Sequence, residues 1–277
     1  MKMFLVENFD EEVTPDLKYY AFDWDDNIMY MPTKIVLKDE EGFEIGMSTE
    51  DFAEHRVNLG KKPFEYKGHT IVGMDPTTAF RNFRTDGDDQ FKVDVFKAKK
   101  GPVWNDFVEA INNGSIFSII TARGHNPNTL KEAVYNYIVN NFNGIDKDEV
   151  LKNLKKFRTF TDEENLSDDE IIRAYLELNK YHPVAFGNDE SAASPEELKV
   201  MAMDDFVSYI KAMAAVLNKK AYLKKDMGNK FTPTRPTIGF SDDDPRNIEV
   251  MKKHFEDKPD KVITYSTAGG KIGRAHV

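Results

Sequence analysis

Residues 17–27 read LKYYAFDWDDN, and this stretch decides the fold. The mostly apolar run Leu17–Phe22 is followed at once by the acids Asp23, Asp25 and Asp26. A short apolar run that ends at polar residues is typical of a buried strand. Side chains alternate in direction as the chain leaves a strand, so Asp23 and Asp25 are expected on the same side. Two carboxylates this close need a cation or a shared proton, which makes this strand end a candidate catalytic or metal site.

Further strand-like and helix-like stretches alternate along the chain. Strands are predicted at Ser115–Ile120, Pro183–Phe186, Thr237–Phe240 and Val262–Tyr265. Helices are predicted at 101–111, 130–142, 147–180, 194–217 and 247–255, and Ser167–Glu170 and Ser194–Glu197 have the pattern of capping boxes. Strands separated by helices indicate an α/β fold with a Rossmann-like three-layer core and a mainly parallel sheet.

Residues 28–100 interrupt this alternation and are too long for an ordinary connection. Thr33–Lys38 and Phe43–Met47 predict a β-hairpin, a helix capped by Ser48 or Thr49 follows, and Phe64–Val72 is strand-like. We therefore expect a core made of residues 1–27 and 101–270, with residues 28–100 inserted as a cap. Residues 271–277 are expected to be a non-native tail, because Ile272–Val277 (IGRAHV) resembles a translated sequencing adaptor.

The composition limits the classes of function. The chain has 277 residues, no cysteine and a net charge of −10 from 38 basic and 48 acidic residues. Thiolate chemistry is excluded, and an acidic protein is poorly suited to holding nucleic acid, although a basic patch around a site is not excluded. The start of the chain has too short an apolar run for a signal peptide, and no stretch approaches a membrane span, so a cytoplasmic protein is expected. The sequence gives no indication of the oligomeric state.

Two further polar segments follow predicted strands. Thr121–Gly124 (TARG) comes after Ser115–Ile120, where a hydroxyl and free backbone N–H groups at the start of a helix could hold an anion. Asp242–Asp244 follows Thr237–Phe240, and clustered carboxylates suit a hard cation such as Mg²⁺. Each segment alone could be an ordinary helix cap. The carboxyl ends of parallel strands meet at one sheet edge, so all three segments are expected in one cleft.

The order of these segments resembles the haloacid-dehalogenase superfamily over roughly residues 17–267. AFDWDDN is similar to the first motif of that family, IITARG to the second and IGFSDDDPRN to the fourth. Asn27 departs from the Thr or Val usual at that position, but a polar side chain there could still brace the loop. The third motif is a single Lys or Arg that no pattern identifies; Lys199, in the first turns of the helix that begins after Ser194, is our choice, with Lys211, Lys230 and Arg235 left open.

The resemblance implies specific roles. Asp23 would attack phosphorus, Asp25 would act as general acid and base, and Lys199 would screen Asp23 from the phosphate charge. Thr121, with Arg123 and Gly124, would bind the transferring phosphoryl group. Mg²⁺ would be held by Asp23, Asp242 and Asp243 and by the backbone carbonyl of Asp25.

The function expected from this resemblance is a Mg²⁺-dependent phosphomonoester hydrolase that acts through an aspartyl-phosphate on Asp23. Its substrate would be a small phosphorylated metabolite or nucleotide. A polynucleotide-end phosphatase, a phosphotransferase and a non-catalytic metal- or phosphate-binding module are the alternatives. Retention of Asp25 disfavours the last, since a binding module needs no acid–base residue.

Overall fold

A parallel sheet forms the centre of the protein. The computed structural model describes residues 18–157, 166–187, 193–225, 236–270 and 273–274. Within them, five strands run parallel in the order β11-β10-β1-β8-β9, and the short strand β12 pairs antiparallel with β11 at one edge. Their bounds are β1 Lys18–Phe22, β8 Phe117–Thr121, β9 Lys180–Pro183, β10 Thr237–Asp242, β11 Lys261–Ser266 and β12 Gly273–Arg274. This confirms the α/β class with a parallel sheet flanked by helices.

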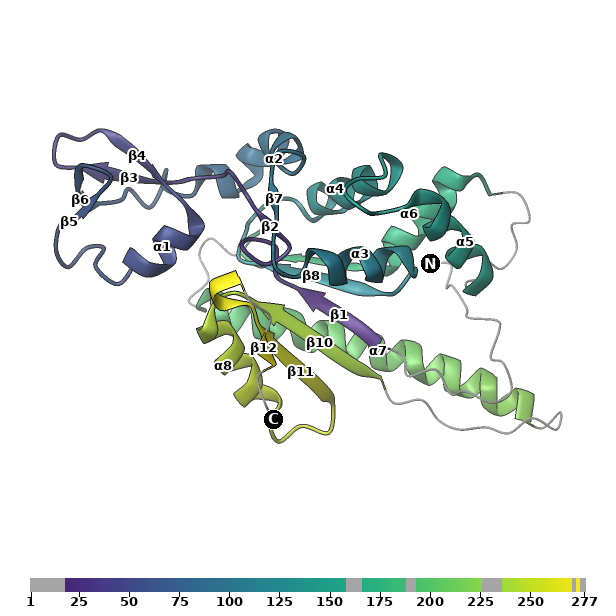
Figure 1. Cartoon of the computed structure of the whole chain (residues 1–277). Coiled ribbons are helices and arrows are strands. Elements are labelled where there is room, and N and C mark those ends of the chain that lie inside the picture. Colours follow the sequence, from purple (N-terminus) through teal and green to yellow (C-terminus); the bar gives the residue numbers. More distant parts are fainter. Residues whose placement is uncertain (1–17, 158–165, 188–192, 226–235, 271–272, 275–277) are drawn as a thin grey trace.

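Helices cover both faces of the sheet (Figure 1). One face is covered by α3 (Trp104–Asn112), α4 (Pro127–Val139), α5 (Lys147–Phe157) and α6 (Asp168–Leu178), and the other by α7 (Pro195–Lys225) and α8 (Pro245–Phe255). The alternation of side chains along β1 explains both layers. Phe22 and Tyr20 pack on the α3–α6 side together with Trp104, whereas Tyr19 and Ala21 pack on the α7–α8 side.

The strand order places a binding crevice beside β1. The chain proceeds from β1 to β8 and β9 on one side, and then crosses to β10 and β11 on the other. The order therefore reverses between β1 and β10, and ligands in open α/β sheets bind outside the carboxyl ends of the strands at this point. Phe22 pairs with Ser241, which sets Asp23 next to Asp242 at that edge.

Three predicted elements differ from the structure. The strand predicted at 183–186 is β9, Lys180–Pro183, an edge strand whose polar residues hide it in the sequence. The helical stretch predicted at 147–180 contains α5 and α6 as separate helices, and residues 158–165 lie outside the described residues. The run 64–72 is two antiparallel strands, β5 (Phe64–Tyr66) and β6 (His69–Gly73), because Lys67 and Gly68 turn the chain at positive φ.

The inserted segment forms a second sheet of its own. Strands β3 (Ile35–Asp39) and β4 (Glu44–Met47) pair antiparallel, and β6 and β5 extend the sheet in the order β4-β3-β6-β5. Helix α1 (Thr49–His55), with Ser48 as its N-cap, follows β4. Two short 3₁₀ turns, η1 (Arg81–Phe83) and η2 (Thr85–Gly87), lead into α2 (Asp88–Asp94). Figure 1 shows this sheet and α1 extending to one side of the core.

The ends of the inserted segment belong to the core. Strand β2 (Met29–Tyr30) pairs antiparallel with β7 (Lys99–Lys100), which brings the entry and exit of the segment together. Ile28, Met29, Phe91, Val95 and Ala98 pack in the hydrophobic cluster of the α3–α6 side. The separate cluster of the inserted sheet runs from Ile35 to Phe83, a shorter range than the predicted 28–100, because α2 packs beside α4.

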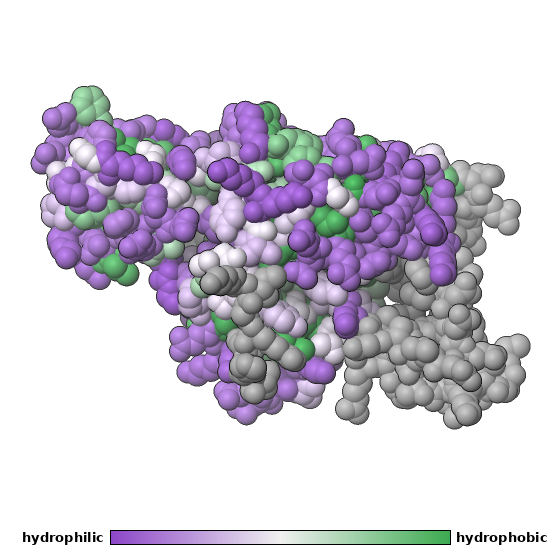
Figure 2. Space-filling model, in the orientation of Figure 1, coloured by the Kyte–Doolittle hydropathy of each residue, from purple (hydrophilic) through white to green (hydrophobic). Residues whose placement is uncertain are grey.

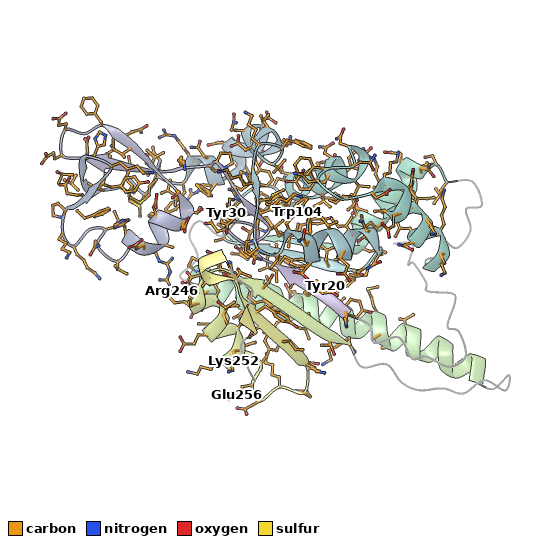
Figure 3. All side chains as sticks on the ribbon, viewed as in Figure 1. Tyr20, Tyr30, Trp104, Arg246, Lys252 and Glu256 are labelled. Atoms are coloured by element: carbon orange, nitrogen blue, oxygen red, sulfur yellow. The ribbon has the colours of Figure 1, made fainter. Side chains whose placement is uncertain are left out.

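The surface visible in Figure 2 is mostly hydrophilic, with apolar residues scattered over it. In Figure 3 the labelled residues of α8, Arg246, Lys252 and Glu256, point away from the sheet. Among the described residues, no helix is both long enough and apolar enough to cross a membrane. Part of the predicted tail, residues 271–272 and 275–277, lies outside the described residues.

Candidate active site

The loop after β1 is held in place by Asn27. The Asp23 amide continues the sheet ladder by donating to the Ser241 carbonyl oxygen at 3.0 Å, and Asp26 then turns the chain with a φ of 53°. The amide of the buried Asn27 side chain donates to the Asp23 carbonyl oxygen at 3.0 Å and to that of Ser241 at 3.1 Å. Its Oδ1 accepts from the Thr267 hydroxyl at 2.9 Å. Asn27 therefore ties the loop to both β10 and the segment after β11.

Three buried or half-buried carboxylates meet beside this loop. One oxygen from each of Asp23, Asp242 and Asp243 lies within 4.8 Å of the others. Burial raises the pKa of Asp23 well above its ordinary value despite the opposing charge of Lys199. Burial, followed by the charge of Asp242, raises the pKa of Asp243 to about 8. The cluster thus carries a strong electrostatic cost when all three groups are ionised, and a cation would relieve it.

Asp242 is the most firmly held of the three. Its Oδ1 accepts from the Asp244 amide and from the Asn247 side chain, both at 2.9 Å. Its Oδ2 accepts from the same Asn247 side chain at 3.0 Å. These donors come from the start of α8, so the Asp-Asp-Pro turn that begins this helix also orients the carboxylate toward β1.

Lys199 lies between two of the carboxylates. Its Nζ donates to Asp23 Oδ1 at 2.8 Å and to Asp242 Oδ2 at 2.7 Å, and its side chain is 3% exposed. Burial alone would lower the pKa of Lys199, but the two carboxylates outweigh it and raise the pKa above its ordinary value. The reciprocal cap of Ser194 and Glu197 starts α7 at the position that brings Lys199 to the sheet edge. The structure therefore places the lysine chosen from the sequence in direct contact with Asp23.

Asp25 lies apart from the three-carboxylate cluster and pairs with an arginine. Arg123 donates from Nε to Asp25 Oδ2 and from Nη2 to Asp25 Oδ1, both at 2.7 Å. The Arg123 side chain is 1% exposed, and that of Asp25 is 15% exposed. The predicted role of Asp25 in metal binding uses its backbone carbonyl, so this ion pair does not compete with it.

The loop after β8 is tied to the inserted segment. Thr121 is buried, and its hydroxyl oxygen accepts from the Arg123 amide at 3.3 Å. The Gly124 amide donates to the Phe83 carbonyl oxygen at 2.7 Å. Free backbone N–H groups were expected here, but the amides of Arg123 and Gly124 both have partners within the protein. Gly124 instead allows the loop after β8 to lie close to the backbone of Ala185, since a Cβ at position 124 would lie 3.2 Å from the Ala185 carbonyl carbon.

His125 is a site residue whose importance the sequence does not reveal. Its ring is buried, with Nε2 3.0 Å from Arg123 Nη1 and Nδ1 2.8 Å from Asp88 Oδ1. Burial, followed by the charge of Arg123, lowers the pKa of His125 to about 4. The spacing of Arg123 and His125, two residues apart in an extended loop, is the only sequence signal, and it does not identify Asp88 in the inserted segment.

A cleft of about 340 Å³ lies between the core and the inserted segment. The core side includes Asp23, Asp25, Thr121, Lys199 and Asp243. The inserted side combines apolar residues with polar and charged ones, namely Ile35, Phe52, Ala53, Phe80 and Phe83 with Thr49, Arg56 and Arg84. Across it, Arg56 Nη2 lies 3.4 Å from Glu196 Oε1 and 3.3 Å from Asp244 Oδ2. All sequence-predicted site residues except the fully buried Asp242 therefore line one cleft, whose other wall comes from the inserted segment.

No protein-family model, no curated protein and no solved structure matches the chain.

Proposed function

We propose that this protein is a Mg²⁺-dependent phosphomonoester hydrolase of the haloacid-dehalogenase type, with Asp23 as the nucleophile. One observation carries the proposal. The Asp23 carboxylate lies at the switch point of a parallel sheet, within 4.8 Å of the Asp242 and Asp243 carboxylates, and Lys199 donates to it at 2.8 Å. A buried anion beside a cation and a potential metal site is the environment that an attacking carboxylate needs.

The proposed reaction has two steps. In the first, a carboxylate oxygen of Asp23 bonds to phosphorus while the ester P–O bond breaks, and Asp25 gives a proton to the leaving oxygen. In the second, Asp25 takes a proton from water as that water attacks phosphorus, which releases inorganic phosphate and restores the Asp23 carboxylate. The Thr121 hydroxyl, which lines the cleft, would hold the transferring group. Lys199 would offset the charge of Asp23 as the phosphate dianion approaches.

The donor set fits Mg²⁺, which prefers oxygen ligands. Asp23, Asp242 and Asp243 supply carboxylate oxygens close enough to share one ion, and their mutual repulsion favours a cation between them. The backbone carbonyl of Asp25 would complete the protein ligands. The bound ion would offset the repulsion between the Asp23 carboxylate and the substrate phosphate.

Residues 28–100 would act as a cap that selects the substrate. The inserted side of the cleft is lined by Phe52 and Phe80, whose rings meet edge to face at 5.6 Å, and by Ile35. A small phosphate ester whose leaving group presents an apolar face, such as the base of a nucleoside, fits against these side chains. The net charge of −10 disfavours a polynucleotide.

The test is a phosphate-release screen over metabolites, nucleotides and oligonucleotide ends, followed by trapping of the phosphoenzyme. Wild-type protein should release phosphate with Mg²⁺ and lose this activity in excess chelator. Asp23→Asn should form no phosphoenzyme, whereas Asp25→Asn should accumulate it from an ester with a good leaving group, because the activated water is lost. Asp204→Asn, in an ion pair with Lys258, is the matched control and should turn over normally.

Specific results would contradict the proposal. Robust turnover in chelator would exclude the metal-dependent mechanism, and labelled phosphate on a residue other than Asp23 would exclude the nucleophile. Metal binding without any phosphate release would favour the non-catalytic module.

A further inference from the structure

All three nitrogens of the Arg123 guanidinium have a hydrogen-bond partner inside the protein, which engages four of its five N–H groups. Besides its two bonds to Asp25, Nη2 lies 3.1 Å from the Thr33 hydroxyl and Nη1 lies 3.0 Å from His125 Nε2. The guanidinium carbon is 4.5 Å from the centre of the Phe83 ring and 5.0 Å from that of Phe91. A phosphate could bind Arg123 through two parallel hydrogen bonds only by displacing one of these partners, so the geometry disfavours a two-bond contact between Arg123 and the substrate.

The hydrogen bonds of His125 have one consistent direction. An arginine can only donate, so His125 Nε2 must accept from Arg123, and the ring proton must lie on Nδ1. Nδ1 then donates to the Asp88 carboxylate, 2.8 Å away. The chain of contacts therefore runs from Asp88 through His125 and Arg123 to Asp25, and each contact fixes the orientation of the next group.

The partners of Arg123 come from widely separated stretches of the chain. Asp25 and His125 belong to the loops after β1 and β8, whereas Thr33, Phe83 and Asp88 belong to residues 28–100. The Gly124 amide, which donates to the Phe83 carbonyl oxygen, adds a second link at the same place. The arginine thus lies where the inserted segment meets the loop after β8.

We infer that Arg123 is a positioning residue for Asp25, and that the inserted segment holds Arg123 in place through Thr33, Phe83 and Asp88. This inference rests on the proposed function, in which Asp25 transfers the proton. Two parallel N–H···O bonds fix both the position and the rotation of a carboxylate. Each oxygen of Asp25 keeps a second lone pair, so the group remains able to exchange a proton with a ligand in the cleft.

The test uses two esters that differ in their need for a proton. The leaving group of an alkyl phosphate would be a strongly basic alkoxide and needs the proton from Asp25 to leave as an alcohol, whereas that of 4-nitrophenyl phosphate leaves as a stabilised anion without it. Arg123→Lys keeps the positive charge but loses the planar fork. It should lower kcat for the alkyl ester by about 10–100-fold, part of the 10²–10⁴-fold that a positioned acid–base group supplies. Phosphoenzyme formation from 4-nitrophenyl phosphate should stay within about threefold of wild type.

A matched control separates this effect from the loss of an arginine in general. Arg81 donates to Glu44 at 2.9 and 2.7 Å in a similar two-bond pair on the exposed part of the inserted segment. Arg81→Lys should leave both esters unaffected. If Arg123→Lys instead raises KM for both esters equally, with kcat unchanged, Arg123 binds the substrate and the inference is wrong.

A double-mutant cycle identifies Asp25 as the group through which Arg123 acts. In an Asp25→Asn background, Arg123→Lys should change the alkyl-ester rate by less than about twofold, because residues that act as a unit are not additive. Additive losses would overturn the inference.

An NMR measurement tests the contact without relying on activity. The Arg123 Nε–H signal should be protected from exchange with water in wild-type protein and lose that protection in Asp25→Asn. An unprotected wild-type signal would refute the ion pair itself. A protected signal in a protein that cleaves no ester would mean that the contact exists but the proposed function, and with it the positioning role, is wrong.

Discussion

The buried His125 should make the stability of the protein depend on pH. The pKa of His125 is lowered from 6.5 to about 4, so the unfolded chain binds more protons than the folded one between these values. The free energy of unfolding therefore rises with pH through this window. Above about pH 6.5 it no longer changes with the titration of His125, and as the pH falls toward 4 the contribution of the neutral His125 is lost. A difference of 2.5 pKa units at 1.36 kcal/mol each corresponds to about 3 kcal/mol lost by pH 4.

The substitution that tests this pH dependence is His125→Gln, because glutamine keeps one hydrogen-bond acceptor and one donor group but cannot titrate. The substitution also removes ring packing against Phe91, 4.6 Å away, so the variant should be less stable at neutral pH. The slope of stability against pH is therefore the quantity to compare. Urea unfolding at several pH values between 4.5 and 7.5 should give a shallower slope for His125→Gln than for wild type.

His69→Gln is the control for the exchange itself. The ring of His69 is 44% exposed and bonds to Asp39, and this variant leaves His125 in place, so the slope that depends on His125 should remain. Identical slopes for wild type and His125→Gln would refute the argument, because they would show that His125 has the same proton affinity in the folded and unfolded states.

Three other substitutions should have measurable effects. Lys199→Met leaves two buried carboxylates without their shared cation. In urea unfolding with chelator it should lower the free energy of unfolding by about 3–5 kcal/mol, and added Mg²⁺ should restore part of this loss. An unchanged urea midpoint would contradict the assigned contacts. Asn27→Leu removes the hydrogen bonds that hold the loop after β1 and should lower the free energy of unfolding by about 1–3 kcal/mol. A variant with the same melting temperature as the wild type would show that these hydrogen bonds do not stabilise the protein. Phe52→Ala should raise KM for the preferred ester about tenfold, as expected for roughly 1.5 kcal/mol of lost apolar contact, whereas Phe43→Ala, 61% exposed on the inserted segment, should not.

The parallel sheet and its functional edge could be predicted because their signals are local. Apolar runs ending in acids identify β1 and β10, and in parallel sheets such ends must meet. Lys199 could be chosen because the cap at Ser194 fixes where α7 begins, and the first turns of such a helix lie at the same edge.

The arginine network could not be predicted, because it depends on contacts between distant segments. Arg123 has the sequence context of a phosphate-binding loop, and nothing near it indicates that Asp25, 98 residues earlier, would accept both of its bonds. Asp88 begins α2, which packs beside α4 in the core, whereas the sequence predicts that residues 28–100 form a separate cap. Edge strand β9 was misplaced for a related reason: its polar residues resemble a loop unless the neighbouring strand is known.

The long separation between the parts of the site has a consequence for synthesis on the ribosome. Asp23 and Lys199 are 176 residues apart, so at about 5–20 residues per second Asp23 emerges roughly 10–35 s before Lys199. Strand β10, which carries Asp242, follows later still and enters the sheet beside β1. During that interval β1 lacks both neighbours until β8 is made and lacks β10 throughout, and its acidic end lacks the cation that offsets it. A nascent chain arrested before residue 199 should therefore be unable to bury Asp23, and the candidate site can form only after nearly the whole sheet has been made.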